Sequence, residues 1–297
     1  MNRFSPETLG QRSERARTDD PALDYCLWPY ARPRPSTGDA LRTSALLSLS
    51  LAVAGVADDM GPLTEAIRAT AGEFRTVFGV KWAGKSLSWE FYFYDYDRWE
   101  RGLGMAEVAR GISGLVHWDA PVDDTKPYFM FSIELDARHA RGDLPLEQVD
   151  VYVGTPDTGT SAGICYGLTS AGYGLRNLYH FYDAKSQFDA ALAKAYATVR
   201  LDARKTDPET LFWPEMTGAQ TLVVANKRNC DAIYFSRIRA AQLALFLRRA
   251  EFPRAISDFL ATNLDAFDHH LFDVGYDYEV RPGGGIRITK GSFYGLL

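Results

Sequence analysis

The sequence predicts an α+β protein in which about ten strands, arranged as five hairpins, close into an antiparallel barrel inside a ring of helices. Three observations lead to this fold class. Strand-like segments come in back-to-back pairs, and short turns join such pairs antiparallel. Helical stretches lie between most of the pairs. Many strands have one tyrosine-rich face and one aliphatic or Phe-rich face, and a closed barrel shelters both while leaving no exposed edge.

The predicted strand pairs are 74–82 with 87–95, 127–135 with 148–154, 162–169 with 175–182, 220–227 with 232–238, and 270–280 with 285–295. Strands that come in twos do not suit a doubly wound fold, which needs helical crossovers and near-continuous aliphatic strands. Three strand-to-helix junctions resemble one another: EFYFYDYDRWERGL, LYHFYDAKSQFDAAL and AIYFSRIRAAQLALFL. Repeated units of this kind bury their apolar faces by closing on one another.

The whole chain is divided into an N-terminal arm and one barrel domain. We expect residues 1–38 to form a partly irregular N-terminal arm, extended over the proline-rich stretch 29–35, and residues 39–297 to form a single αββα-type domain. Helices are expected over 39–70, 96–116, 184–199 and 239–267, with the last broken near Pro253. In the first of these, Asp39 is a candidate cap and Gly61-Pro62 a candidate break. The apolar run 45–57 is too short to span a bilayer and predicts a buried helix.

Alternation along each strand divides the side chains between two faces. The polar face is expected to carry Glu90, Tyr92 and Tyr94 in one strand, Tyr128, Met130, Ser132 and Glu134 in a second, Asp150 and Tyr152 in a third, and Ile286, Ile288, Lys290, Ser292 and Tyr294 in the last. An open sheet with a solvated face is the alternative. Such a face would be rich in lysine, whereas this one is rich in tyrosine, which buries its ring and keeps its hydroxyl paired. The pattern therefore favours an enclosed, aromatic lumen.

Composition and charge indicate the kind of partner and the compartment to expect. The 297 residues are 46% hydrophobic, and the net charge of -5 argues against a nucleic-acid partner. Three separated cysteines predict a reduced, cytoplasmic protein, and the charged N-terminus without an apolar segment argues against a signal peptide. We also expect no membrane insertion and a monomer or weak homodimer.

Standard catalytic and metal-binding signatures are absent from the sequence. It contains no GxGxxG after a strand, no P-loop, no HExxH, no GxSxG and no DDxxD. The five histidines do not form a plausible metal site, and the PGGG run at 282–285 predicts a hairpin turn. No cofactor is therefore expected to be required, and magnesium remains an option that no motif supports.

The candidate site residues lie on the polar face. Glu90 stands in a tyrosine-rich strand, as a base or cation stabiliser or as a structural carboxylate paired with a nearby Lys or Arg. Lys290, on the same face as Ser292 and Tyr294, needs an anion, either a phosphate or a carboxylate such as Glu134. Further candidates are the tyrosines Tyr92, Tyr152 and Tyr234. Four basic residues on other strands, of which some are expected to point outward, complete the set: Lys81, Arg176, Lys227 and Arg237.

Three stretches, SWEFYFY, KRNCDAIYFSRIRAAQLALFL and GIRITKGSFYG, make the chain resemble the aromatic prenyltransferases of the ABBA (PT-barrel) type over about residues 74–297. The resemblance implies that Lys290 binds diphosphate, that Tyr234 and Tyr294 line and shield the pocket, and that Glu90 orients or deprotonates the acceptor. The substrates would be an allylic diphosphate and an aromatic or indole-like small molecule. The chain departs from the family in the short link GTPDTGTSAG, where the family has two helices, and in a fourth strand without a basic residue.

Three functions remain open at this point. The first is prenyl transfer, which requires at least two basic side chains at one end of the lumen. The second is a diphosphate-independent natural-product cyclase or isomerase, for which Glu90, Tyr92 and Tyr234 would suffice. The third is a non-catalytic barrel that binds a hydrophobic ligand, in which every carboxylate would be paired.

Overall fold

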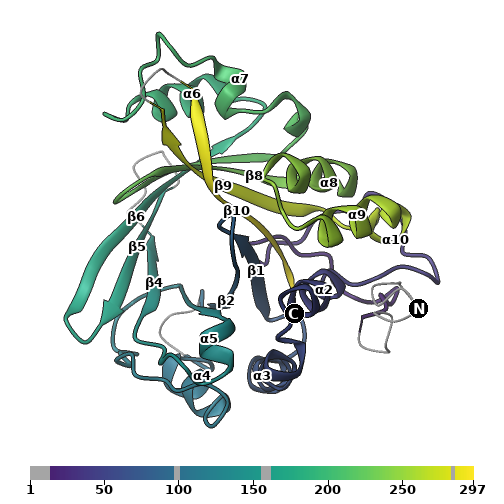
Figure 1. The fold of residues 1–297 in the computed structure, drawn as a ribbon, viewed down its shortest axis with the longest axis vertical. Coiled ribbons are helices and arrows are strands. Elements are labelled where there is room, and N and C mark those ends of the chain that lie inside the picture. Colours follow the sequence, from purple (N-terminus) through teal and green to yellow (C-terminus); the bar gives the residue numbers. More distant parts are fainter. Residues whose placement is uncertain (1–13, 97–100, 155–161, 282–284) are drawn as a thin grey trace.

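The computed structural model describes residues 14–96, 101–154, 162–281 and 285–297. Within them, ten antiparallel strands close into a barrel in the order β1-β10-β9-β8-β7-β6-β5-β4-β3-β2, which confirms the predicted fold class (Figure 1). The strands are β1 Thr76–Trp82, β2 Leu87–Tyr94, β3 Met130–Asp136, β4 Val149–Gly154, β5 Ala162–Thr169, β6 Gly172–Asp183, β7 Thr221–Lys227, β8 Asp231–Ile238, β9 Phe272–Val280 and β10 Ile286–Leu296.

Helices surround much of the barrel. They are α2 Ser44–Ala54, α3 Ala57–Ala71, α4 Met105–Gly111, α5 Ala137–Ala140, α6 Phe188–Tyr196, α7 Pro208–Leu211, α8 Ala240–Arg249, α9 Arg254–Thr262 and α10 Leu264–Phe267, with a 3-10 turn at Pro214–Met216. α2 and α3 pack on β1, α6 packs on β6 and β7, and α8 packs on β9 (Figure 1). The outward side chains Trp89, Phe91 and Phe93 of β2 are fully buried in the core between barrel and helices.

Strand register gives the barrel two different ends. β1 finishes at Trp82, opposite Leu87 of β2 and Gly291 of β10, so the turns of the β1–β2 and β9–β10 hairpins lie at the same end. The turns of the β5–β6 and β7–β8 hairpins lie there too, because every neighbouring pair is antiparallel. We call this the turn end. The N-terminal arm meets the opposite end, which we call the arm end.

Two helix predictions near the start of the domain were wrong in detail. The break falls at Gly55, whose φ of 70° is the left-handed conformation that ends many helices. α3 instead continues through Pro62, at the cost of one backbone hydrogen bond. Asp39 caps neither helix: the residue before α2 is Thr43, and Asp39 is paired with Arg15. Residues 45–54 of the apolar run lie in α2, whose leucines are mostly buried as expected, but Gly55 ends this helix inside the run.

The other predicted helices are shorter than expected. Within 96–116, of which 97–100 lie outside the described residues, only Met105–Gly111 is helical, because the backbone at Gly104 is extended. Within 184–199 the helix is Phe188–Tyr196, so Val199 lies beyond its end and is fully exposed rather than on a buried face. The stretch 239–267 is interrupted at Pro253 as predicted, and again at Asn263.

The predicted strand faces fail at two positions. Between Ile288 and Lys290 a β-bulge inserts one extra residue, so the two isoleucines pack outward against the main core while Lys290 faces the lumen. β3 begins only at Met130, so the strand alternation does not extend back to Tyr128 and Phe129. Tyr128 is buried outside the barrel and Phe129 lines the lumen, the reverse of the expectation.

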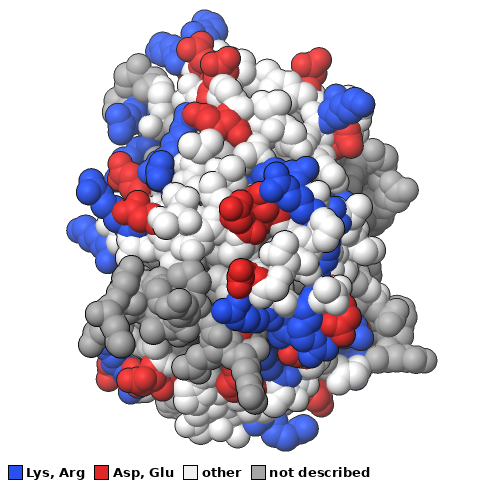
Figure 2. Space-filling model, turned by 90° about the vertical axis from the view of Figure 1, so that its right-hand side faces the viewer, with Lys and Arg blue, Asp and Glu red and all other residues white. Residues whose placement is uncertain are grey.

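The described surface carries a mixture of charges, and apolar side chains are exposed on β6. On the face seen in Figure 2, basic and acidic side chains are interspersed, and neither sign forms an extended field. Helices leave part of β6 uncovered, so Tyr173, Leu175 and Leu178 are exposed there. None of the helices in the described ranges has the length and apolar character needed to cross a bilayer.

Candidate functional site

All eleven residues predicted for the site line one cavity of about 1380 Å³ in the barrel lumen. They are Lys81, Glu90, Tyr92, Tyr152, Arg176, Lys227, Tyr234, Arg237, Lys290, Ser292 and Tyr294. The volume exceeds the roughly 300–1,000 Å³ of ordinary small-molecule pockets. The structure thus brings these residues together, and their individual roles stay predictions.

Alternation alone does not aim every one of these side chains inward. Lys290 faces the lumen because the bulge in β10 precedes it. Arg176 is the extra residue of a second irregularity, where Cys165 pairs with Asn177 but the next residue, Tyr166, pairs with Leu175. Bulges re-aim side chains near functional sites in many sheets. The side chains of Lys290 and Arg176 therefore face the lumen because of local departures from ideal strand geometry.

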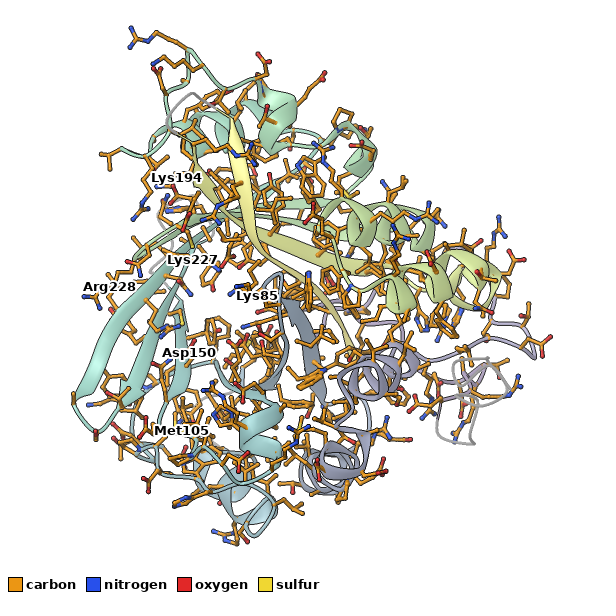
Figure 3. All side chains as sticks on the ribbon, in the orientation of Figure 1. Lys85, Met105, Asp150, Lys194, Lys227 and Arg228 are labelled. Carbon is orange, nitrogen blue, oxygen red and sulfur yellow. The ribbon has the colours of Figure 1, made fainter. Side chains whose placement is uncertain are left out.

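Basic and acidic side chains gather at the turn end of the cavity, in what we call the charged end. It consists of Lys81, Glu134, Asp150, Arg176, Lys227, Asp277 and Lys290. Figure 3 shows Lys227 and Asp150 reaching the barrel interior from different strands, β7 and β4. Two strands, β6 and β5, lie between β7 and β4 in the sheet order, and the curvature of the barrel turns both side chains toward the same lumen.

Two lysines of the charged end share one carboxylate. Asp277 lies 2.7 Å from the Nζ of Lys227 and 3.1 Å from the Nζ of Lys290. Burial opposes ionisation of Asp277, but the two lysines outweigh it and hold the pKa of this carboxyl at about 2. Burial and the charge of Lys227 lower the pKa of Lys290. Asp277 is the only carboxylate in direct contact with these two lysines among the described residues, and the charge of Glu134 also acts on Lys290.

The other two basic residues are also paired. The Nζ of Lys81 lies 2.7 Å from Glu134 and contacts Glu90, and the Arg176 guanidinium lies 3.6 Å from Asp150. Burial and the charge of Glu90 raise the pKa of Asp150 to about 6. Each of the four cations of the charged end therefore has a carboxylate partner, and a ligand anion must compete with it.

Glu90 is a buried carboxylate whose hydrogen-bonding capacity is filled by the protein. Its Oε1 accepts from the hydroxyls of Ser132 and, at 3.4 Å, Tyr152, and its Oε2 accepts from Tyr92 and contacts Lys81. A carboxylate has about four acceptor positions, so these donors occupy them. A substrate N–H or O–H reaches Glu90 only by displacing one donor, and the long contact to Tyr152 is the weakest.

A belt of tyrosine rings lies between the charged end and the arm end. The belt consists of Tyr25, Tyr92, Tyr152, Tyr179, Tyr234 and Tyr294, with neighbouring ring centroids 4.7 to 6.3 Å apart. Burial raises the pKa of Tyr234, so its hydroxyl is neutral, and Lys227 lies 5.7 Å from the centre of its ring. Aromatic faces at this range attract cations.

Two members of the belt, Tyr179 and Tyr25, were not among the site residues predicted from the sequence, for different reasons. Tyr179 lies in β6 beyond the irregularity at Arg176, and counting by two from a neighbour on its lumen side would have found it. Tyr25 belongs to the irregular arm, where no periodicity indicates which way a side chain faces. Asp277 was also missed, because its partnership with two lysines depends on the pairing of four strands, β7 to β10.

Glycines opposite the belt leave room for its rings. A Cβ at Gly275 of β9 would lie 2.0 Å from Cδ1 of Tyr234, its cross-strand partner. We therefore expect Gly275→Ala to displace the Tyr234 ring and to lower the free energy of unfolding by about 1–3 kcal/mol, measured by urea denaturation.

The matched control for this substitution is Gly163→Ala, also on the lumen side, whose new Cβ would meet only Phe181 at an ordinary 3.8 Å. We expect the control to change stability little. Equal stability of Gly275→Ala and wild type would show that the Tyr234 ring does not need this gap.

Comparison with known proteins adds no identity. The chain matches no family model, and no curated protein matches it either. Within the described residues, no group of three or more His, Cys, Asp or Glu side chains is placed to hold a metal ion. The site is described by its fold and its cavity: an aromatic lumen with charged side chains at one end of an antiparallel barrel.

Proposed function

We propose that this protein is an aromatic prenyltransferase, which moves an allylic group from its diphosphate to an aromatic or indole-like small molecule in the barrel lumen. One observation carries the proposal. Strand register gathers Lys81, Arg176, Lys227 and Lys290 at one end of the cavity, directly beside the tyrosine belt. This arrangement matches the two needs of the reaction, an anion site and a shielded cation site.

In this mechanism the allylic C–O bond breaks and the diphosphate leaves with the electron pair. Lys227 and Lys290 stabilise the leaving group, because Asp277 neutralises only one of their two charges. The allylic cation lies against the tyrosine faces, which attract it and keep water away. Basic side chains supply the positive charge, so the proposal does not depend on magnesium.

The acceptor completes the reaction near Glu90. Its aromatic carbon forms the new C–C bond and loses a proton, and Glu90 orients the acceptor or receives that proton. To do so the acceptor takes the place of Tyr152, whose hydroxyl lies 3.4 Å from Oε1. The exchange replaces one hydrogen bond to Glu90 by another.

The test is calorimetric titration with a non-hydrolysable allylic diphosphate analogue, with and without magnesium. We expect saturable binding in both conditions, and we expect Lys290→Ala to weaken it about ten- to hundredfold, because a hydrogen bond to a charged group is lost. Lys205→Ala is the matched control, since Lys205 is exposed and pairs with Asp202 outside the cavity. Binding that is absent in every condition, with acceptor present as well, would refute the proposal.

A second candidate, a non-catalytic barrel for a hydrophobic ligand, is favoured by one observation. All four cations of the charged end are paired with carboxylates, and Glu90 has its acceptor positions filled. Such a barrel would bind apolar aromatic compounds as well in Lys290→Ala as in wild type, and the same titrations separate the two functions.

A further inference from the structure

The N-terminal arm covers the arm end of the barrel and is attached to it by hydrogen bonds. The backbone N–H of Tyr25 donates to Asp273 of β9 at 2.9 Å. Its carbonyl accepts from the hydroxyl of Tyr94 at the end of β2, and the carbonyl of Cys26 accepts from Tyr96 at 2.7 Å. The arm is thus held from two strands of the barrel wall.

A salt bridge and local hydrogen bonds shape this part of the arm. Asp24 lies 2.8 Å from the guanidinium of Arg237 and also accepts the backbone N–H groups of Cys26 and Trp28. Arg237 has a φ of 60°, a conformation that is uncommon for any residue except glycine, at the irregularity in β8. Asp24 is buried, so the bridge is sheltered from solvent. The turn that presents Tyr25 is therefore well defined.

The ring of Tyr25 completes the tyrosine belt from outside the barrel. It packs edge-on against Tyr92 at 5.2 Å and Tyr294 at 4.7 Å between centroids. It also lines the same cavity as Lys227 and Lys290, which lie at the opposite end. A ligand whose anionic group lies at the charged end would extend its apolar part toward this ring.

We infer that Tyr25 is a specificity-determining residue, whose ring limits how far the apolar part of a ligand reaches toward the arm end. Under the function proposed above, on which this step rests, the apolar part is a prenyl chain. Tyr25 then sets the longest prenyl chain that the protein accepts. A residue of the arm, rather than one of the ten strands, then selects the substrate.

The experiment measures binding of two ligand series of increasing chain length to wild type, Tyr25→Ala, Tyr25→Phe and Tyr25→Trp. The first series is n-alkyl diphosphates and the second is uncharged 4-n-alkylphenols. We expect Tyr25→Ala to bind the longest members at least tenfold more tightly than wild type does and the shortest members equally well. Tyr25→Phe keeps the ring and should keep the wild-type profile, whereas Tyr25→Trp should disfavour long chains.

The outcomes separate this inference from the proposed function. A shifted length profile with alkylphenols but no binding of alkyl diphosphates would support the role of Tyr25 and count against prenyl transfer. Length profiles that are the same in the alanine, tryptophan and wild-type proteins would overturn the inference. The tryptophan variant keeps the test decisive if the alanine variant does not fold, since it predicts the opposite shift.

Native cysteines at the two ends of the cavity give an independent readout. Cys26 lies on the arm beside Tyr25, Cys230 lies near Lys227, and both are partly exposed and line the cavity. In wild type, we expect a bound long-chain ligand to slow maleimide labelling of Cys230 more than that of Cys26. In Tyr25→Ala it should slow both, and protection that does not differ between the two proteins would contradict the inference.

Discussion

Asp277→Asn is expected to lower the free energy of unfolding at pH 7 by about 3–5 kcal/mol, because it leaves the charges of Lys227 and Lys290 buried without their shared partner. Raising the pH should restore part of the loss, since an unpaired buried lysine gives up its proton more readily. Inorganic pyrophosphate should stabilise the variant more than it stabilises wild type, because it supplies the missing negative charge. Urea denaturation at pH 7 and pH 9.5, with and without pyrophosphate, measures each effect.

Glu279→Gln is the control for this substitution. Glu279 lies on the same strand, but its partner Arg287 and the carboxylate itself are both exposed, so the pair is worth at most about 1 kcal/mol. If Asp277→Asn were as stable as this control, the two lysines would not depend on Asp277. If pyrophosphate gave no added stability to the variant, the charged end would not be an anion site.

The same carboxylate predicts how wild-type stability responds to acid. The pKa of Asp277 is about 2 in the folded protein, below its ordinary value of 3.8. A depressed folded pKa contributes stability above the unfolded pKa and loses it as the pH falls through the folded one. About 2 kcal/mol should therefore disappear between pH 4 and pH 2, and Asp277→Asn should lack this part of the acid transition.

Glu90→Gln is expected to lower both stability and activity. Hydroxyl groups can donate or accept, so Tyr92, Ser132 and Tyr152 can adapt to an amide, but Lys81 only donates and loses a charged partner. We expect a loss of about 2–4 kcal/mol in the free energy of unfolding. If Glu90 orients or deprotonates the acceptor, kcat/KM for prenyl transfer should also fall about 10²- to 10⁴-fold.

A second variant, Glu134→Gln, separates the structural role of Glu90 from its role in the reaction. Glu134 also pairs with Lys81, yet it is 42% exposed, and its other hydrogen bond comes from Ser88. We expect a smaller loss of stability and a smaller fall in rate from this variant than from Glu90→Gln. A Glu90→Gln enzyme that is destabilised but transfers the prenyl group at the wild-type rate would show that Glu90 is structural.

The sequence predicted the barrel and most of its lumen because both follow from local patterns. Alternation along β2 places Glu90 and Tyr92 on the lumen face whatever the strand pairs with, and it holds equally for Lys290, Ser292 and Tyr294 after the bulge. Where the backbone departs from regular alternation, the prediction failed. Ile286 and Ile288 were assigned to the wrong face because the bulge that follows them adds a residue.

Tertiary structure alone decided which of these side chains meet. Lys227 of β7 and Lys290 of β10 share Asp277 of β9 because strand register places the three residues at the same height along the barrel. Register depends on contacts between segments that lie far apart in the chain. Tyr25 enters the belt through hydrogen bonds to β9 and to the end of β2, across more than 200 residues in the case of Asp273. Local sequence determines the direction of a side chain relative to its own backbone, whereas the partner it meets is determined by how distant segments pack.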